Sequence, residues 1–294
     1  MHARANTSLA NFDPYAVNVD LHCHSNVSDG VLAPEEVVER AARNGVAWIA
    51  LTDHDEVGGL DRAHARAREL GIGFIAGVEV SVTWAGKTIH VVGLGIDRTQ
   101  LVLNEGLART RHGRTERAKA ISDALALVGI EDAYEGAMRY VANPDLISRS
   151  HFARYLVELG VCDDMREVFG RYLVEGKPGY VPHRWARLSE AVQWIRAAGG
   201  EAVVAHPARY RFSDFELHTF FEEFVAAGGV GVEVTTSAHT QDETRRYAKL
   251  ARDYGLRASR GSDFHSPNES RVDVGALPPL PDAVEPIWAA WGIG

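Results

Sequence analysis

The chain has 294 residues, of which 46% are hydrophobic and 24% charged, a composition typical of a soluble globular protein with a large core. Its formal net charge of -9 argues against a bulk electrostatic grip on long nucleic acid. Its two cysteines, Cys23 and Cys162, give no disulfide framework and fit a reducing compartment. Because no leader pattern and no apolar run of membrane-spanning length is found, we expect a cytoplasmic protein with no membrane partner.

The run 17–24 alternates apolar and polar residues, which predicts a strand that runs into a polar loop. On such a strand His22 and His24 leave the backbone on one side, whereas Cys23 points to the other side and into the core. Two converging imidazoles, with the carboxylate of Asp29 nearby, suit a divalent metal ion. Two surface histidines are the alternative interpretation of this pattern alone.

The first part of the chain then alternates between helical and strand patterns. The predicted elements are a helix over 34–42, a strand over 46–52, a helix over 60–70, and strands over 72–82 and 88–94. The strand over 46–52 is a nearly continuous apolar run, which is typical of a parallel strand buried on both faces.

Each of the later strands carries a residue able to bind metal, namely His54, Glu79 and His90. A carboxylate inside an apolar strand, as at Glu79, is costly unless it is paired or bound to a metal ion. A salt bridge to an arginine or an edge-strand position is the alternative for Glu79. Asp53 and Asp55 either orient His54 or are solvated carboxylates of a loop.

Residues 98–185 show helical spacing and no clear buried strand, which predicts a helical insertion. Ser148 to Arg154 predicts a helix N-terminus where backbone donors and the guanidinium of Arg149 could hold an anion. Lys177, His183 and Arg184 lie in a basic segment that returns to the first domain. The remaining cationic residues predict a solvated helix face; they are Arg109, Arg111, Arg114, Arg117 and Lys119.

After the insertion the α/β alternation resumes, bringing the count to about seven strands. The predicted elements are helices over 188–198, 214–227 and 241–254, and strands over 201–205, 231–234 and 256–259. His206, Asp263 and His265 follow strands, and Glu233 lies in one with a supporting or structural role. Polar residues at the carboxyl ends of so many strands favour a closed barrel over a doubly wound sheet, which gathers its ligands at one switch point.

The residues with the strongest pattern resemble the PHP (polymerase and histidinol phosphatase) family. The motifs are His22-x-His24, Thr52-Asp53-His54-Asp55, Gly77-Val78-Glu79, His90, Ala205-His206-Pro207 and Ser262-Asp263-x-His265. Asp29, the Asp-His-Asp run and the segment from Ser148 to Arg154 are similar to a subgroup called ribonuclease AM or nucleoside 3′,5′-bisphosphate phosphatase. The resemblance implies an α/β fold, a distorted seven-stranded (β/α) barrel built from 1–97 and 186–294, with 98–185 as a helical substrate cap.

The resemblance also implies a trinuclear metal cluster of Mn²⁺, Fe²⁺ or Zn²⁺. One ion would take His22, His24, Glu79 and Asp263, a second Glu79, His90 and His206, and a third Asp29, His54 and His265. Glu79 would then be a bridge, which explains its position in an apolar strand. Other branches of the family commonly have histidine at position 29. An aspartate there makes the third site a harder ligand set, which is more tolerant of Mn²⁺ or Fe²⁺.

The function implied is metal-dependent hydrolysis of a nucleotide phosphate ester, the 3′-phosphate of a nucleoside 3′,5′-bisphosphate, with 5′-to-3′ exonuclease activity on short RNA as a second activity. Glu79, His206, Asp263 and Arg149 are the expected catalytic residues, and Arg149, Lys177, His183 and Arg184 the expected substrate contacts. The alternatives are a histidinol-phosphate-type phosphatase, a non-hydrolytic metal- or nucleotide-binding module, and a metal-dependent amide or lactone hydrolase. The expected partner is a nucleotide or short oligonucleotide and not long duplex nucleic acid; no oligomeric state is indicated.

Two groups of residues are expected to be bystanders. His2, His112, His218 and His239 are predicted to lie at the surface. Trp84, Trp185 and Trp194 are predicted to pack in the core and not to stack on bases.

Overall fold

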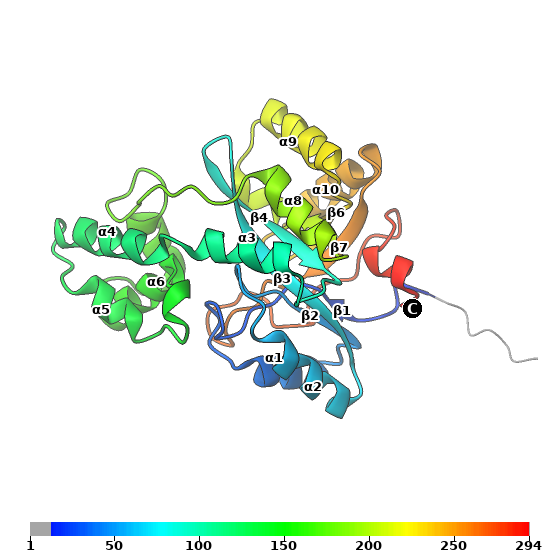
Figure 1. Ribbon diagram of the computed structural model, residues 1–294, viewed down its shortest axis with the longest axis horizontal. Helices are drawn as coiled ribbons and strands as arrows, with labels where there is room; N and C mark the ends of the chain where they lie inside the picture. The colour runs from blue at the N-terminus through cyan, green and yellow to red at the C-terminus, as the bar shows by residue number, and fades with distance from the viewer. Residues whose placement is uncertain (1–12, 294) are drawn as a thin grey trace, which may run out of the picture.

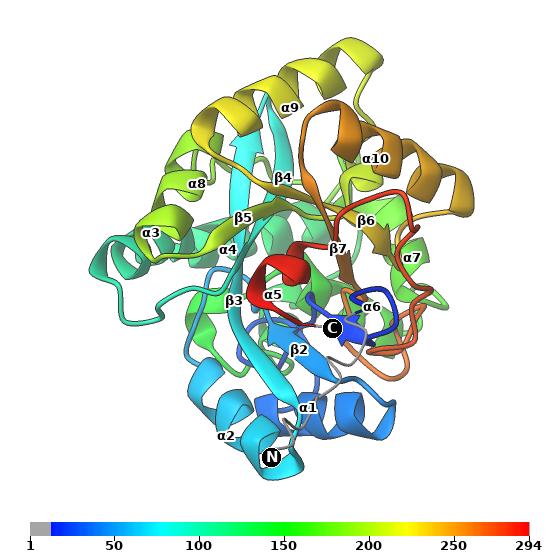
Figure 2. The same cartoon turned by 90° about the vertical axis from the view of Figure 1, so that its right-hand side faces the viewer.

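The computed structural model describes residues 13–293, in which a seven-stranded sheet curls into a barrel with helices on its outside (Figures 1 and 2). The strands are β1 (Val19–Asp20), β2 (Trp48–Leu51), β3 (Gly73–Trp84), β4 (Lys87–Leu94), β5 (Glu201–Val204), β6 (Gly231–Thr236) and β7 (Arg257–Gly261). This arrangement confirms the predicted distorted seven-stranded barrel.

The strands follow one another around the barrel in sequence order, from β1 to β7. β1, β2 and β3 are parallel to one another, as are β5, β6 and β7, whereas β4 is antiparallel to both of its neighbours. Backbone hydrogen bonds join the two ends of the sheet, from Leu21 N–H to Arg260 C=O at 2.9 Å and from Asp263 N–H to His22 C=O at 2.8 Å. The residues that follow β1 and β7 therefore lie side by side.

A tight hairpin between β3 and β4 reverses the chain direction. Ala85 and Gly86 in its turn have φ of +47° and +77°, the backbone of a two-residue turn that matches the twist of antiparallel strands. Ser81 of β3 is paired directly with His90 of β4, so Glu79 and His90 lie on the same face of the hairpin. His90 thus enters the barrel from within an antiparallel strand, as Glu79 does from β3, and not from a strand's carboxyl end.

Six helices surround the barrel, and ordinary start and stop signals mark some of their ends. They are α1 (Pro34–Arg43), α2 (Leu60–Leu70), α3 (Leu101–Arg111), α8 (Leu188–Ala197), α9 (Asp214–Ala227) and α10 (Gln241–Asp253). Pro34 at the first position of α1 and Gly71 after α2, at φ +71°, are such signals. Figure 2 shows α1 and α2 on one side of the sheet and α8, α9 and α10 around the other strands.

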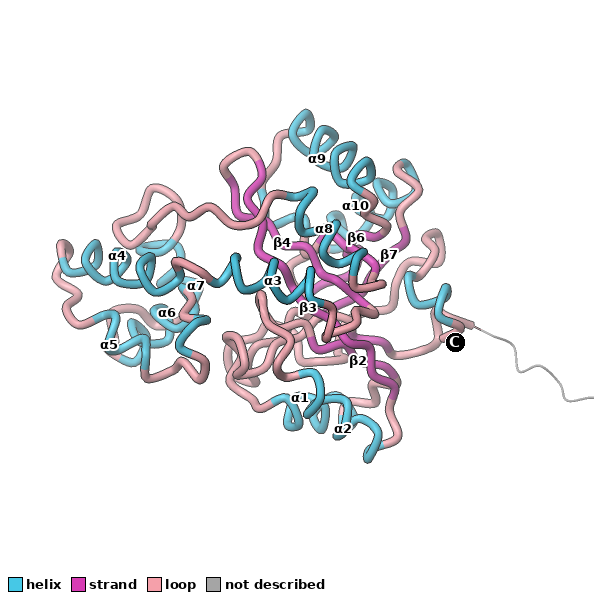
Figure 3. The backbone as a smooth tube through the Cα atoms, viewed as in Figure 1, coloured by secondary structure: helices cyan, strands magenta, loops and turns pink. Residues whose placement is uncertain are grey.

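The insertion forms a separate group of helices joined by loops, on the left of Figures 1 and 3. It contains α4 (Arg114–Ala126), α5 (Ala133–Met138), η1 (Pro144–Leu146), α6 (Arg149–Glu158), α7 (Met165–Val168) and the π-helical turn η2 (Phe169–Leu173). Its buried residues, from Ala118 to Leu173, form a hydrophobic cluster of their own. We call this group, residues 113–185, the cap.

The helix α3 differs from the rest of the insertion, because its Leu103 and Leu107 belong to the core of the barrel. Judged by side-chain packing, the chain passes from the core of the barrel to the core of the cap near Gly113, between α3 and α4. The boundary at 97/98 between barrel and insertion stays a prediction.

Two short 3₁₀ turns complete the described elements, η3 (Pro207–Tyr210) and η4 (Ile287–Trp291). Among residues 13–293 no helix combines the length and the apolar character needed to cross a lipid bilayer. The expected cytoplasmic location stays a prediction, and His2 lies outside the described residues.

Candidate metal centre

All the residues predicted to bind metal meet at one end of the barrel. His22, His24 and Asp29 follow β1, His54 follows β2, Glu79 and His90 lie in the β3–β4 hairpin, His206 follows β5, and Asp263 and His265 follow β7. Glu79 is fully buried, in spite of its charge, and lies at the centre of the group.

Four buried side chains form the first set: His22, His24, Glu79 and Asp263. Their ligand atoms all lie within 4.8 Å of one another. Oε2 of Glu79 lies 3.3 Å from Nε2 of both His22 and His24. Oδ1 of Asp263 lies 3.4 Å and 3.2 Å from the same two nitrogens. The structure thus brings together the set that the sequence assigned to one ion.

A second set gathers around Asp29. Its Oδ1 lies 3.3 Å from Nε2 of His265 and 3.8 Å from Nε2 of His54. His24 also lies within reach of this set, and its ring stacks on that of His265 with 4.1 Å between centroids. The sequence had placed His24 with one ion only, whereas it stands between two of the sets.

The other oxygen of Glu79 faces a third set. Its Oε1 lies 3.0 Å from Nδ1 of His90 and 3.0 Å from Nε2 of His206. By proximity of ligand atoms His54 also groups with Glu79 and His90, since its Nδ1 lies 2.9 Å from Oε2. We favour His206 for this set because it shares Oε1 with His90, whereas His54 directs Nε2 toward Asp29. The two oxygens of Glu79 therefore face different sets, as a bridging carboxylate requires.

The chemistry of the cluster fits bound cations. Nε2 of His22 and Nε2 of His24 are only 3.1 Å apart, in a buried site where six imidazoles and three carboxylates are packed together. Among the described residues, several of these buried ligand atoms have no hydrogen-bond partner: Nδ1 of His24, His54 and His90, and the oxygens Asp29 Oδ1, Glu79 Oε2 and Asp263 Oδ2. Burying such groups without partners is costly, and cations would satisfy them. Imidazole nitrogen with carboxylate oxygen suits Mn²⁺, Fe²⁺ or Zn²⁺.

The carboxylates of the centre are held in their charged form. Burial alone would raise the pKa of Glu79, but the imidazoles of His90, His54 and His22 hold it well below its usual range. Burial lowers the pKa of His206 to about 4, and Arg209 adds to this effect, so the ring is neutral and its lone pair is free for a cation. Burial would also lower the pKa of His22 and His24, but the carboxylates around them raise it, to about 10 for His24, so a metal ion at those two rings would displace a proton.

Glu233 supports the centre from outside the ligand sets. Its Oε1 lies 2.7 Å from Nδ1 of His22, and its Oε2 accepts the backbone N–H of His206 at 2.5 Å. Such a contact favours the tautomer of His22 that carries its proton on Nδ1 and leaves Nε2 free for metal. The supporting role was one of the two that we considered for this residue.

Asp53 and Asp55 have other partners than His54. Asp53 accepts hydrogen bonds from Ser25 N–H at 2.8 Å and from the hydroxyls of Ser25 and Ser28 at 2.6 Å, so it shapes the loop that carries His24 and Asp29. Asp55 accepts the backbone N–H of Ser81 at 2.8 Å and forms an ion pair with Arg114. Both are buried. Neither alternative from the sequence, orienting His54 or lying solvated in a loop, is therefore correct.

The cap contacts the metal centre directly through the start of α6. Ser148 is the N-cap of this helix, as predicted, and its hydroxyl donates to Oδ2 of Asp29 at 3.2 Å. Arg154 donates to the backbone C=O of Asp29 at 2.7 Å and pairs with Glu269 at 2.9 Å. The cap therefore fixes both the loop that carries Asp29 and one of the carboxylate oxygens of this predicted metal ligand.

The predicted substrate contacts occupy different environments. Arg149 is partly buried, donates to the C=O of Leu173 at 3.1 Å and has no carboxylate partner among the described residues. His183 is half-buried against Trp185, with 4.2 Å between ring centroids. Lys177 and Arg184 are exposed and make no ion pair within residues 13–293. Their role in substrate binding stays a prediction.

Several cationic residues that we expected on a solvated helix face instead line the junction of cap and barrel. Arg114 is buried and Arg117 is partly buried, and their guanidinium groups lie 4.6 Å and 5.3 Å from the ring of Trp185. Burial, together with the guanidinium groups of Arg149 and Arg114, lowers the pKa of Arg117 to about 9. Arg111 likewise donates to the backbone of Asp55. The solvated-face prediction holds for Arg109 and Lys119, which are exposed.

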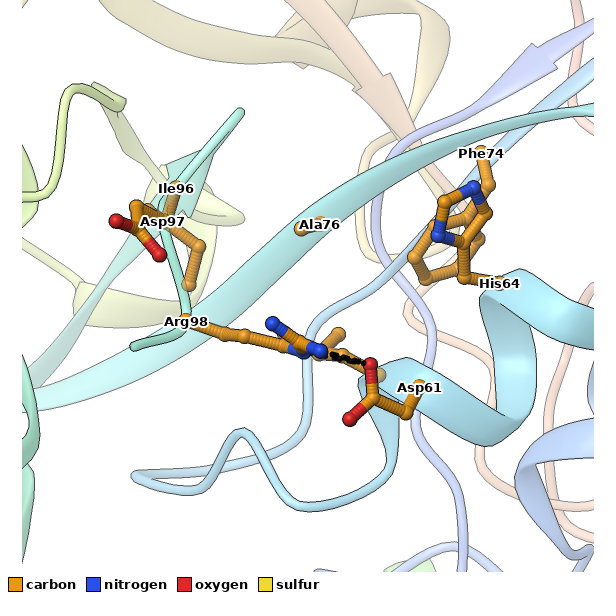
Figure 4. Close-up of a pocket in the computed structure, with 8 residues that line it drawn as sticks. Asp61, His64, Phe74, Ala76, Ile96, Asp97 and Arg98 are labelled. Carbon is orange, nitrogen blue, oxygen red and sulfur yellow. Dashed lines mark hydrogen bonds and ion pairs between the residues drawn. The ribbon is translucent and has the colours of Figure 1, made fainter. Parts of the chain in front are cut away.

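A pocket of about 390 Å³ lies away from these residues, between α2, β3 and the end of β4 (Figure 4). His64 stacks on Phe74 at one side, and Arg98 donates to Asp61 at 2.7 Å at the other. It is lined by none of the predicted metal ligands, so it is not part of the candidate centre.

The PHP domain family matches residues 20–205 of the chain. A 3′,5′-nucleoside bisphosphate phosphatase of Chromobacterium violaceum is 51% identical over 92% of this chain and 95% of its own length. The 5′-3′ exoribonuclease Rnm of Escherichia coli is 40% identical over 94% of both. A solved amidohydrolase structure from Chromobacterium violaceum, with bound sulfate and no metal, has a TM-score of 0.91 at 50% identity and covers 94% of this chain and 96% of that one. A protein of Bifidobacterium adolescentis described as a metal-dependent phosphoesterase has a TM-score of 0.80 at 25% identity, over 96% of both.

Proposed function

The chain belongs to the PHP domain family, and we propose that it is a metal-dependent phosphoesterase that removes the 3′-phosphate of nucleoside 3′,5′-bisphosphates. One observation carries the choice of substrate. Arg149 follows Ser148 in the chain, and Ser148 is hydrogen-bonded to Asp29 of the metal centre. Arg117 is close enough to Arg149 for the two charges to interact, and neither has a carboxylate partner among the described residues. An anion-binding group therefore stands next to a cluster of predicted metal ligands.

A nucleoside 3′,5′-bisphosphate carries two phosphates, one for each of these places. The scissile 3′-phosphate would lie at the predicted metal ligands, and the 5′-phosphate would lie between the guanidinium groups of the cap. Guanidinium groups form paired hydrogen bonds with phosphate oxygens, which fixes the orientation of the substrate as well as its charge. Binding energy from the remote 5′-phosphate would then position the 3′-ester for hydrolysis.

The proposed cofactor is a set of three divalent ions, Mn²⁺, Fe²⁺ or Zn²⁺, held by the three sets around Glu79. When bound, such ions lower the pKa of water and neutralise the charge that gathers on the phosphoryl oxygens. Glu79 and Asp263, both kept ionised, would hold the ions in the barrel, and neutral His206 would complete the set at Oε1 of Glu79. Glu233 would keep His22 oriented during turnover.

The same geometry supports exonuclease activity on short RNA as a second function. A 5′-phosphorylated RNA end is a nucleoside 5′-phosphate whose 3′-phosphate is esterified by the next nucleotide, so it presents the same two groups. The similarity to exoribonuclease Rnm favours this activity. The net charge of -9 disfavours long nucleic acid, so we expect short oligonucleotides and not duplexes as substrates.

Phosphate release from a panel of compounds tests the proposal. Chelator-treated protein is reloaded with Mn²⁺ and incubated with adenosine 3′,5′-bisphosphate, AMP, histidinol phosphate and a short 5′-phosphorylated RNA, with amide and lactone substrates as a separate class. We expect the highest kcat/KM on the bisphosphate, turnover of the RNA, and no release without metal. Preference for histidinol phosphate, for an amide or for a lactone would contradict the proposal.

A further inference from the structure

Arg209 has an unusual position beside the metal centre. It lies in η3, three residues after His206, and its side chain remains 46% exposed. Its guanidinium forms an ion pair with Asp263, with 2.5 Å between Nη2 and Oδ2. This ion pair engages Nη2, and Arg209 makes no other ion pair within residues 13–293, so the N–H groups on Nε and Nη1 are available for another acceptor.

The backbone around Arg209 is held in place by several contacts. His206 N–H donates to Glu233 at 2.5 Å, Ala208 N–H approaches Nε2 of His239 at 3.4 Å, and the hydroxyl of Tyr210 donates to the C=O of Ala205 at 2.7 Å. His239, which we expected at the surface, is partly buried and donates from Nδ1 to Val234 at 3.0 Å. The loop that carries Arg209 is therefore fixed before any ligand arrives, which is what preorganised binding requires.

The guanidinium of Arg209 lies on the side of the metal centre that Asp263 forms. One oxygen of Asp263 faces Nε2 of His22 and His24, and the other faces Arg209. The guanidinium and the predicted metal site therefore lie on opposite oxygens of the same carboxylate. Other arginines near the centre are already used, since Arg154 pairs with Glu269 and Arg114 with Asp55. Arg209 combines a fixed position, an exposed guanidinium and unused donors.

We propose that Arg209 is a catalytic residue that binds an oxygen of the phosphoryl group undergoing transfer, so that it acts on the 3′-phosphate and not on the 5′-phosphate. This inference rests on the proposed function. During hydrolysis a P–O bond to the oxygen of water forms, the P–O bond to the 3′-oxygen breaks, and that oxygen takes up a proton from water. Arg209 remains protonated throughout and stabilises charge that grows on the phosphoryl oxygens.

The test compares Arg209→Ala and Arg209→Lys with wild type and with Arg211→Ala. Arg211 is exposed and lies in the same loop, and it makes no hydrogen bond or ion pair with the described residues, so it is a matched control. Each protein is loaded with Mn²⁺, its bound metal is counted, and kcat and KM are measured on adenosine 3′,5′-bisphosphate and on a nitrophenyl phosphate. The affinity for inorganic phosphate is measured separately by calorimetry.

For Arg209→Ala we expect a fall in kcat of about 10²-fold on both substrates, because both share the scissile phosphate. Phosphate affinity should fall about tenfold, bound metal should stay at the wild-type level, and Arg209→Lys should recover only part of the loss because lysine lacks the planar fork. Arg211→Ala should match wild type in every measurement.

Wild-type kcat and phosphate affinity in Arg209→Ala would overturn the assignment and leave the arginine as a partner of Asp263. Loss of metal in that variant would also overturn it, since Arg209 would then act only by positioning a ligand. A loss confined to the bisphosphate would place it on the 5′-phosphate instead. Absence of turnover in wild type would refute the proposed function, whereas phosphate calorimetry on the same proteins would still decide the role of Arg209.

Discussion

Nδ1 of His22 lies 2.7 Å from one carboxylate oxygen of Glu233, while the other oxygen holds the backbone N–H of His206. One buried side chain therefore orients two predicted metal ligands that are far apart in sequence. Removing such a partner typically costs about 10–100-fold in metal affinity. We expect Glu233→Ala to lower Mn²⁺ affinity by this amount, measured by calorimetric titration of chelator-treated protein.

Glu233→Gln provides the control for this prediction. The amide keeps one oxygen that can accept from His22 or from the backbone N–H of His206, but its NH₂ group faces the other of these two donors. The Mn²⁺ affinity of Glu233→Gln should therefore fall between those of wild type and Glu233→Ala. Unchanged affinity in Glu233→Ala would mean that His22 is held without the carboxylate.

The bridging position of Glu79 predicts a loss of metal as well as activity. Its Oε1 lies 3.0 Å from His90 and from His206, and its Oε2 lies 3.3 Å from His22 and from His24. A neutral amide cannot offset two cations, so Glu79→Gln should purify with less bound metal and without phosphatase activity.

Metal content by elemental analysis decides the matter for Glu79, with Glu222→Gln on the exposed surface of α9 as the matched control. Circular dichroism should show that both variants are folded. A Glu79→Gln protein that retains the wild-type amount of metal would remove the bridging assignment.

The set around Asp29 predicts a separate loss. Asp29→Ala and His265→Ala each remove a ligand from this set, while the second oxygen of Glu79 and its partners His90 and His206 remain. Each variant should lose roughly one metal equivalent and keep most of its fold. Elemental analysis of both variants gives the count. Unchanged stoichiometry in the two would indicate a dinuclear centre.

Much of the barrel could be predicted because its start and stop signals are local. Pro34 at a helix start and Gly71 at a helix end act through their own backbone, and the structure places α1 and α2 accordingly. The direction of β4 was missed because alternation of apolar residues does not report strand direction. The available signal was the two-residue turn Ala85-Gly86, since φ is positive at both positions and glycine favours this backbone.

Glu79 could be singled out from sequence because a carboxylate inside an apolar strand is costly unless it is paired or bound to metal, and the full set of ligands followed from the resemblance to the PHP family. The residues that hold these ligands in place could not be predicted from the sequence. The sequence predicts Arg114 as a solvated residue on its helix, and only the folded chain brings it to Asp55, from which it is separated by two helices and two strands. Nothing in the sequence placed Arg209 beside Asp263, because only the folded barrel brings these two residues together.

The start of α6 predicts how the substrate is oriented. Arg149 lies next to the N-cap residue Ser148, packs 5.7 Å from the ring of Phe169, and has no carboxylate partner among the described residues. Lysine supplies charge without the planar fork, so Arg149→Lys should already impair turnover while bound metal stays at the wild-type level. Arg166→Lys, at an exposed position of the cap, is the matched control and should behave as wild type.

The pattern of loss across substrates identifies which phosphate Arg149 binds. If it holds the 5′-phosphate, kcat/KM should fall about 10-fold or more for adenosine 3′,5′-bisphosphate and hardly at all for a nitrophenyl phosphate, which lacks the remote group. Equal losses on both substrates would place Arg149 at the scissile phosphate, where Arg209 is proposed to act. No loss on either would return Arg149 to a purely structural role, with its hydrogen bond to the C=O of Leu173 as its main contact.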